Sequence, residues 1–132
     1  MERQSPRPFH AHVYYDGDES MAAQQLRVGL LRAMASGELP GVLYVGAMRD
    51  RAVGPHPKPQ FEIHAREAAL PALLPLIESS GLTALIHPLT DDDLADHTTL
   101  ARWIGAPLPL DCSVLDPPGC NQGVARFGRA DM

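Results

Sequence analysis

Histidine is the residue type in this 132-residue sequence that is best suited to chemistry, because the chain carries six of them. Neutral imidazole is the commonest metal ligand in proteins, and its pKa near neutrality also suits acid–base work. His10 and His12 are one residue apart, so on a strand they would share a face. The other four are dispersed: His56, His64, His87 and His97. Whether they meet depends on the elements that carry them.

The apolar periodicity predicts a mixed α+β chain. Strands are expected over 9–15, 41–48, 60–65 and 82–87, and helices over 19–35, 66–80 and 91–104. This order is that of the ferredoxin-like βαββαβ sandwich, here with a C-terminal helix and an extended arm over 105–110. Two helices then cover one face of an antiparallel sheet, and the other face stays open. Thr90 is the expected N-cap of the C-terminal helix.

The alternation along each strand predicts which side chains face away from the helices. The apolar set of the first strand (Phe9, Ala11, Val13 and Tyr15) must pack on the helices. The opposite set therefore points to the open face, and the same test applies to the third strand and, if Ile86 faces the helices, to the fourth. The residues expected on the open face are His10, His12, Tyr14, Gln60, Glu62, His64 and His87.

Several imidazoles with a carboxylate on one rigid surface favour a divalent metal. Two histidines and one carboxylate form the non-haem Fe(II) pattern, whose open positions accept O2 and substrate. Other interpretations stay open at this point. A histidine on a half-exposed strand is commonly solvated, and an H-x-H pair alone is a weak signal. His56 could be a turn residue of the proline-rich loop 49–59, and His97 a helix residue bonded to the backbone.

Composition and charge exclude several classes of protein. With 11 Lys+Arg against 16 Asp+Glu, the net charge of −5 argues against a nucleic-acid binder. No apolar run reaches the roughly 18 residues of a membrane helix, and no secretory signal is visible. Cys112 and Cys120 form neither a disulfide framework nor a zinc knuckle, so a cytoplasmic location is expected. We expect one domain over 9–115, a disordered segment 1–8 and a tail over 116–132 that is loosely ordered or ordered by a partner subunit.

Three stretches resemble a known family. They are FHAHVYYD at 9–16, VGPHPKPQFEI at 53–63 and IHPLTDDDLADHTTLARWIGAPLPLD at 86–111. Together they are similar to the DOPA 4,5-dioxygenase family of aromatic ring-cleaving dioxygenases. The resemblance implies a small cytoplasmic ferredoxin-like protein, expected to be a homodimer. It also implies Fe(II)-dependent extradiol cleavage of a catechol such as DOPA with O2.

The family pattern also implies which residues act. It includes histidines at the positions of His10, His12, His56, His87 and His97, does not require His64, and varies at Glu62. An all-histidine site is thus an alternative to the carboxylate triad. The hypothesis places the metal among His10, His12, His56 and His87. His97 is the expected proton shuttle, with His56 as second choice, and Tyr14 is expected to hydrogen-bond a substrate oxygen.

Two other functions fit the same sequence. One is a cofactor-free enzyme on a dimeric ferredoxin-like sheet, a monooxygenase or an isomerase, in which His and Tyr do acid–base work. Co-purifying metal and loss of activity on chelation would distinguish the dioxygenase from it. The other is a non-catalytic module that binds a small ligand on the open sheet face. Binding of a catechol without turnover under any metal or O2 condition would indicate that module.

Overall fold

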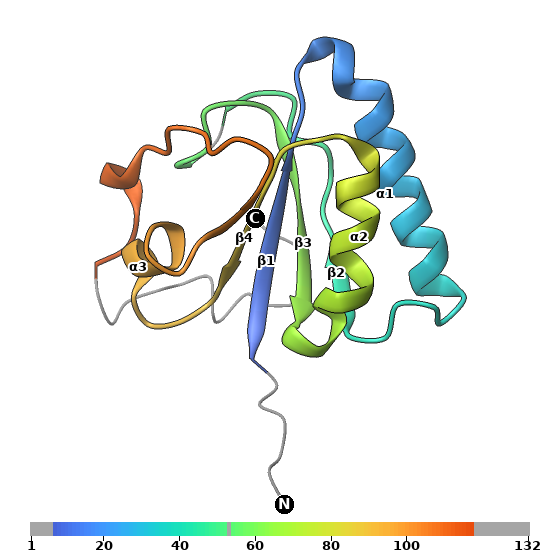
Figure 1. The fold of residues 1–132 in the computed structure, drawn as a ribbon. Coiled ribbons are helices and arrows are strands. Elements are labelled where there is room, and N and C mark those ends of the chain that lie inside the picture. The colour runs from blue at the N-terminus through green and yellow to red at the C-terminus, as the bar shows by residue number, and fades with distance from the viewer. Residues whose placement is uncertain (1–6, 53, 118–132) are drawn as a thin grey trace, which may run out of the picture.

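The computed structural model describes residues 7–52 and 54–117, which form a five-stranded antiparallel sheet with helices on both sides (Figure 1). The strands are β1 (Pro8–Tyr14), β2 (Val42–Val45), β3 (Gln60–Arg66), β4 (Ala84–Pro88) and β5 (Arg102–Ile104), in the order β2-β3-β1-β4-β5. The helices are α1 (Ser20–Ala35), α2 (Leu70–Ser80) and α3 (Asp93–His97), with 3-10 turns η1 (Gly17–Glu19), η2 (Glu67–Ala69) and η3 (Cys112–Val114). The predicted ferredoxin-like α+β order is confirmed, and β1 pairs with both β3 and β4.

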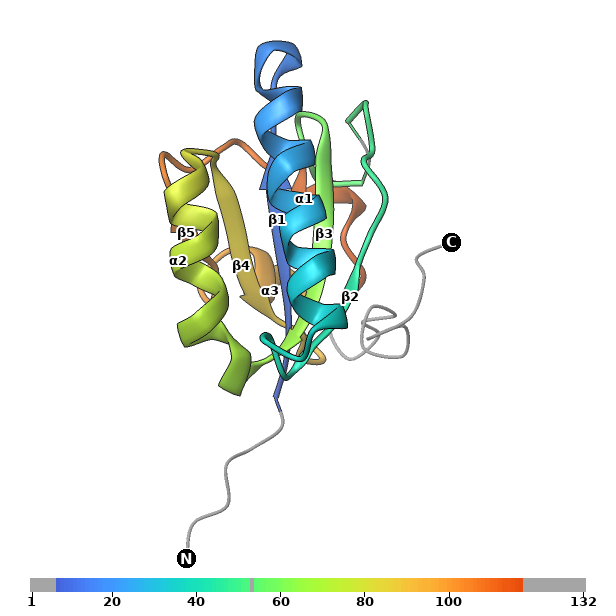
Figure 2. The same cartoon turned by 90° about the vertical axis from the view of Figure 1, so that its right-hand side faces the viewer.

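The main core lies between the sheet and the pair α1 and α2, which stand side by side on one face (Figure 2). Apolar residues at spacings of three and four on α2 are buried there, and so is the apolar set of β1. The phase of β4, which the sequence left open, is resolved because Ile86 belongs to this core. Gly81 ends α2 with φ of +77°, a left-handed conformation that glycine adopts without strain.

The predicted helix over 91–104 is wrong beyond its first turn and a half. The helix α3 covers only Asp93–His97, and residues 102–104 form β5, which pairs with β4. Helix propensity is weak after His97, where the β-branched pair Thr98 and Thr99 follows. The edge of β4 meanwhile offers unpaired backbone groups. The ladder with β4 therefore prevails over local helix formation.

The cap of α3 also differs from the prediction. Asp92, not Thr90, is the N-cap, and its side chain accepts a hydrogen bond from the Ala95 amide. Thr90 instead donates its hydroxyl and its amide to the carboxylate of Asp96, at 2.7 and 2.8 Å. Asp96 is fully buried, so its hydrogen bonds with Thr90 hold the segment before α3 against the buried side of the helix.

The expectation of an open second face is wrong. The helix α3 and the chain after β5 lie on the side of the sheet opposite α1 and α2 (Figures 1 and 2). The side chains that alternate toward this side are buried, His12 at 4 % exposure and His87 at 1 %. The sheet therefore carries a second, polar interior on this side, which is where the candidate site lies.

The ends of the predicted domain fall partly outside the described residues. Residues 1–6, most of the segment expected to be disordered, lie outside them, as do residues 118–132 and with them Cys120. Within the described part, the Arg7 carbonyl accepts the Glu67 amide at 2.9 Å and Asp116 donates its amide to Asp93 at 2.9 Å. No described helix is long and apolar enough to cross a membrane.

Candidate metal centre

All six histidines are buried, between 1 % and 8 % exposed. They gather on the sheet face away from α1 and α2. Register explains the gathering, because His10 on β1 stands opposite His64 on β3 and opposite His87 on β4. His12 stands opposite Glu62 in the same ladder. The predicted convergence of these strands' polar faces is thus confirmed.

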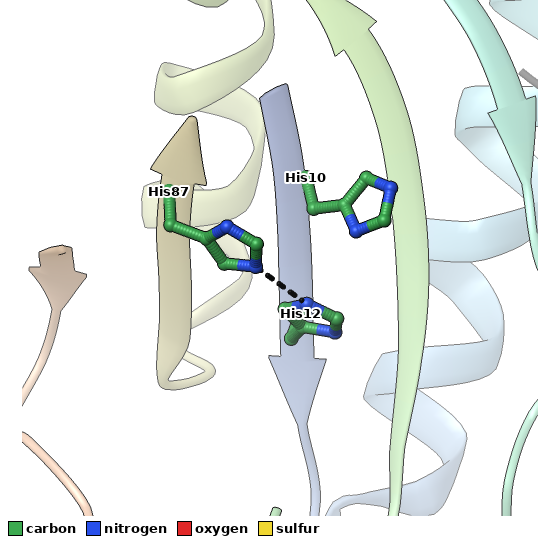
Figure 3. A group of neighbouring side chains, drawn as sticks. All are labelled: His10, His12 and His87. Atoms are coloured by element: carbon green, nitrogen blue, oxygen red, sulfur yellow. Dashed lines mark hydrogen bonds between the residues drawn. The ribbon is translucent and has the colours of Figure 1, made fainter. Parts of the chain in front are cut away.

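Three of these imidazoles form a group that could hold a metal ion. His10, His12 and His87 each present a ring nitrogen within 4.8 Å of the other two (Figure 3). The Nε2 atoms of His12 and His87 are 3.0 Å apart. Two nitrogen ligands at right angles on an ion with bonds of about 2.1 Å would be about 3.0 Å apart. The spacing therefore fits a shared divalent cation.

The surroundings of the two facing rings also fit a metal centre. The Nδ1–H of His87 donates to the Pro88 carbonyl at 2.8 Å, and Nδ1 of His12 lies 3.1 Å from Oε1 of Gln60. Metal-binding histidines characteristically make such a bond from the nitrogen that does not bind the ion. Burial, together with neighbouring histidines, holds the pKa of His12 and of His87 well below the ordinary value. Both rings are therefore in the neutral form that binds metal.

A second group of possible ligands overlaps the first. It consists of His10, Glu62 and His64, and Nε2 of His64 lies 3.1 Å from Oε1 of Glu62. However, the rings of His10 and His64 are stacked, with centroids 4.0 Å apart and planes 15° from parallel. Imidazole lone pairs lie in the ring plane, so two stacked rings cannot both direct theirs at one ion. The rings of His12 and His87 are also nearly parallel, at 16°, but their centroids are 5.1 Å apart and their Nε2 atoms 3.0 Å apart, so these rings meet at their edges. The geometry therefore favours the group of His10, His12 and His87.

His56 lies beside this group rather than in it. Its ring is 4.1 Å from that of His12, but its Nδ1 accepts the Tyr14 hydroxyl at 2.7 Å. Burial, helped by His97, lowers the pKa of His56 to about 3, and burial raises the pKa of Tyr14. The tyrosine thus remains a phenol and the imidazole remains neutral. Trp103 of β5 stacks on Tyr14, with ring centroids 6.0 Å apart.

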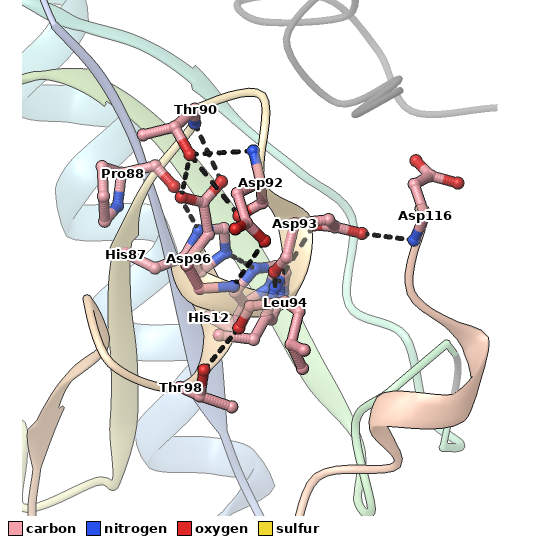
Figure 4. Close-up of polar contacts among 12 residues, drawn as sticks. His12, His87, Pro88, Thr90, Asp92, Asp93, Leu94, Asp96, Thr98 and Asp116 are labelled. Atoms are coloured by element: carbon pink, nitrogen blue, oxygen red, sulfur yellow. Dashed lines mark hydrogen bonds and ion pairs between the residues drawn. The ribbon is translucent and has the colours of Figure 1, made fainter. Parts of the chain in front are cut away.

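His97 reaches the cluster from α3. Its ring centroid is 4.2 Å from that of His87, and its Nδ1–H donates to the Asp93 carbonyl at 2.8 Å. The hydrogen bonds of Thr90, Asp92 and Asp96 hold the helix in place (Figure 4). Burial raises the pKa of Asp96, although the bonds from Thr90 act in the opposite direction. His97 is thus a fixed neighbour of His87, with Nε2 as its remaining ring nitrogen.

Sequence reasoning placed Gln60 on the correct face but gave it no role, and it gave none to Asp93. Both are buried, Gln60 at 3 % and Asp93 at 8 % exposure. The available sign of a role for Gln60 was its position two residues before Glu62, which puts both side chains on the histidine-bearing face of β3. No local pattern identifies Asp93, because its burial depends on the segment after β5, whose Asp116 amide it accepts.

The comparisons with known proteins place the chain in a family. The Dopa 4,5-dioxygenase family profile matches residues 9–114. The chain belongs to this family. The predicted family is thereby confirmed, and a dioxygenase-family enzyme is supported at that level.

Two curated relatives and a solved structure resemble the chain. The DOPA 4,5-dioxygenase of Amanita muscaria is 30% identical over 114 residues, which cover 83% of this chain and 50% of that protein. An uncharacterized 21.2 kDa protein of Botryotinia fuckeliana is 30% identical over 120 residues, covering 81% and 62%. The chain thus spans between half and two thirds of the length of these relatives. A candidate dioxygenase from Nostoc punctiforme shares the fold, with a TM-score of 0.71, 32% identity, and coverage of 82% of this chain and 90% of that one.

Proposed function

We propose that this protein is an extradiol dioxygenase that uses Fe(II) and O2 to open the ring of a catechol such as DOPA. The observation that carries the proposal is the group of His10, His12 and His87, three buried imidazoles with ring nitrogens within 4.8 Å of one another. Membership of the dioxygenase family supports it, and so does the name of the Amanita muscaria relative. Fe(II) bound there would supply the positions at which a catecholate and O2 meet and exchange electron density.

The protein's own residues have three tasks in this reaction. The first is to keep the ligand rings neutral and oriented, which burial and the Pro88 carbonyl do for His87. The second is to exclude water, and the chain after β5 together with α3 covers the site. The third is to take up the protons that a catechol loses when its oxygens bind a cation.

His97 is the proposed acceptor of such a proton. Its Nδ1–H is held by the Asp93 carbonyl, which leaves Nε2 as the basic nitrogen. Asp93 Oδ1, 3.3 Å from Nδ1, would stabilise the protonated ring. His56 is the second candidate for this proton acceptor. The Tyr14 phenol could shift its hydrogen bond from His56 to a substrate oxygen, which would leave Nδ1 of His56 to accept the proton.

Anaerobic reconstitution with Fe(II), followed by DOPA and then O2, tests the function. We expect one O2 consumed per ring opened, because both oxygen atoms enter the product, and a yellow ring-opened compound that forms only with iron. Bound iron without product on DOPA would redirect the search to other catechols. Neither iron nor product would favour the cofactor-free enzyme or the binding module. The homodimer stays a prediction, which light scattering would test.

A further inference from the structure

The ring proton of His87 has a fixed position. Its Nδ1 lies 2.8 Å from the Pro88 carbonyl oxygen, and a carbonyl can only accept a hydrogen bond. In the neutral ring the proton is therefore on Nδ1, and Nε2 carries a lone pair. That lone pair points at the Nε2 atom of His12, 3.0 Å away.

His12 can face this lone pair in either of two tautomers. In the first, His12 carries its proton on Nε2 and donates it to His87. Its Nδ1 is then an acceptor, and Gln60, whose side chain lies 3.1 Å from Nδ1, must turn its NH2 group toward the ring. In the second, the proton is on Nδ1 and is donated to Oε1 of Gln60. The two Nε2 lone pairs then face each other, an arrangement that a cation bound to both nitrogens would stabilise.

The structure carries a feature of each state: the two Nε2 atoms lie at hydrogen-bond distance, as in the first, whereas the surroundings of His12 Nδ1 suit the second. The atom of Gln60 that faces Nδ1 of His12 is the acceptor Oε1. A carboxylate oxygen of Glu62 lies 3.9 Å from the same Nδ1 and favours a proton there. Gln60 is 3 % exposed, so water does not compete freely for its amide. The two states hold the same number of protons and differ only in the nitrogen that bears one.

We propose that Gln60 is a positioning residue that couples metal binding to the tautomer of His12. When the Gln60 NH2 group faces Nδ1 of His12, as proposed for the metal-free protein, His12 donates its Nε2 proton to His87. When the carboxamide rotates so that Oε1 faces Nδ1, as proposed for the metal-loaded protein, Nε2 of His12 presents its lone pair to the ion. The inference rests on the proposed metal centre, and it adds a residue and a proton shift to it. A carboxylate at position 60 can only accept, so it would hold His12 permanently in the metal-binding tautomer.

Zn(II) titration of the full chain at pH 8 tests the coupling through affinity. Gln60→Met removes both hydrogen-bonding ends at similar volume, and should weaken Zn(II) binding about 10- to 100-fold. Gln60→Glu should bind Zn(II) about tenfold more tightly than the wild type. Gln25→Glu, the same change on the exposed side of α1, should leave the affinity unchanged. Circular dichroism of each variant checks the fold.

Nitrogen NMR of the histidine rings gives a readout that a merely structural role would not move. In the metal-free wild type, His12 should be protonated on Nε2, and with Zn(II) it should be protonated on Nδ1. In metal-free Gln60→Glu it should already be protonated on Nδ1. The comparison of metal-free and Zn(II)-loaded wild type tests the change of tautomer even where Gln60→Met fails to fold.

The outcomes separate the coupling from the metal centre. Saturable Zn(II) binding with His12 protonated on Nδ1 both before and after loading would overturn the coupling and keep the centre. Equal affinities for the wild type and both Gln60 variants would do the same. A wild type that binds no Zn(II) would overturn the centre and the coupling together.

Discussion

His12 is the proposed ligand that faces His87, Gln60 and the ring of His56. We expect His12→Ala to lower Fe(II) affinity at least 100-fold and to bring ring cleavage to background. The fold should persist, because the side chain lies outside the main apolar core. Equilibrium dialysis with iron analysis measures the affinity.

The matched control is His64→Gln, a change of a buried histidine whose ring is stacked on that of His10. It should keep iron affinity within a few-fold of the wild type. Full iron occupancy in His12→Ala would remove His12 from the site. Loss of iron in His64→Gln alone would instead favour the overlapping group that includes Glu62.

Burial of neutral imidazoles also predicts how the metal-free protein responds to acid. The pKa of His12, His56 and His87 is depressed in the folded state, to about 3 for His56, whereas an unfolded histidine titrates near 6.5. Below pH 6.5 the unfolded chain binds more protons than the folded one. Stability should therefore fall as pH drops from 6.5 toward 3, by up to about 1.4 kcal/mol per pH unit for each such histidine.

Urea unfolding of chelator-treated protein between pH 7.5 and 4.5 measures this dependence. The variant His56→Gln should show a shallower slope than the wild type, because one buried imidazole fewer is titrated. A free energy of unfolding that is independent of pH over this range would contradict the neutral, buried state of the cluster.

At the scale of elements, α3 is positioned by polar contacts rather than by an apolar stripe. Asp96 is fully buried and accepts two hydrogen bonds from Thr90. We expect Thr90→Val to lower the free energy of unfolding by about 1–3 kcal/mol, because the hydroxyl donor to a buried carboxylate is lost. The change should also lower turnover, since α3 carries His97. Urea unfolding and steady-state oxygen uptake measure the two effects.

Thr98→Val is the matched control for this change. The Thr98 hydroxyl donates to the Leu94 carbonyl at an exposed position, at 2.6 Å. Its loss should cost less than about 0.5 kcal/mol and leave turnover unchanged. Equal losses in the two variants would show that Asp96 does not anchor the helix.

The elements differ in how far the sequence predicts them. The strand phases of β1 and β3 follow from alternation, because one face of each packs on α1 and α2. Alternation is therefore enough to place His10 and His12 on one face of the sheet, whereas the position of His87 depends on which of Leu85 and Ile86 faces the helices. The length of α3 and the strand β5 do not follow from local pattern. Both depend on the edge of β4, a partner that is distant in sequence from Trp103.

At the scale of the whole molecule, metal binding should stabilise the fold. An ion that binds only the folded state at a hundredfold excess over its Kd adds about 2.7 kcal/mol to the free energy of unfolding. We expect Fe(II) under anaerobic conditions, or Zn(II), to raise Tm in the wild type and not in His12→Ala. Differential scanning calorimetry with and without chelator measures the shift. An equal rise in both proteins would indicate that the ion binds elsewhere.

The whole molecule also shows what a linear pattern cannot reveal. The second face of the sheet was expected to be open, yet Gln60 and Asp93 are buried there. The segments that cover it carry few apolar residues at regular spacing, so hydrophobic periodicity gives no sign of their contact with the sheet. Polar contacts such as that between Asp116 and Asp93 are visible only in three dimensions.

The proposed ligands and the walls of the site come from different parts of the molecule. His10, His12 and His87 come from β1 and β4, whose other faces form the main core, so the spacing of these proposed ligands is set by the fold. The walls of the site come instead from the loop that carries His56, from α3 and from the chain after β5. Directed evolution could therefore exchange these wall segments to admit bulkier or differently charged aromatics while the ligand set remains intact. Substrate range and metal binding would then be inherited as separate traits within one small chain.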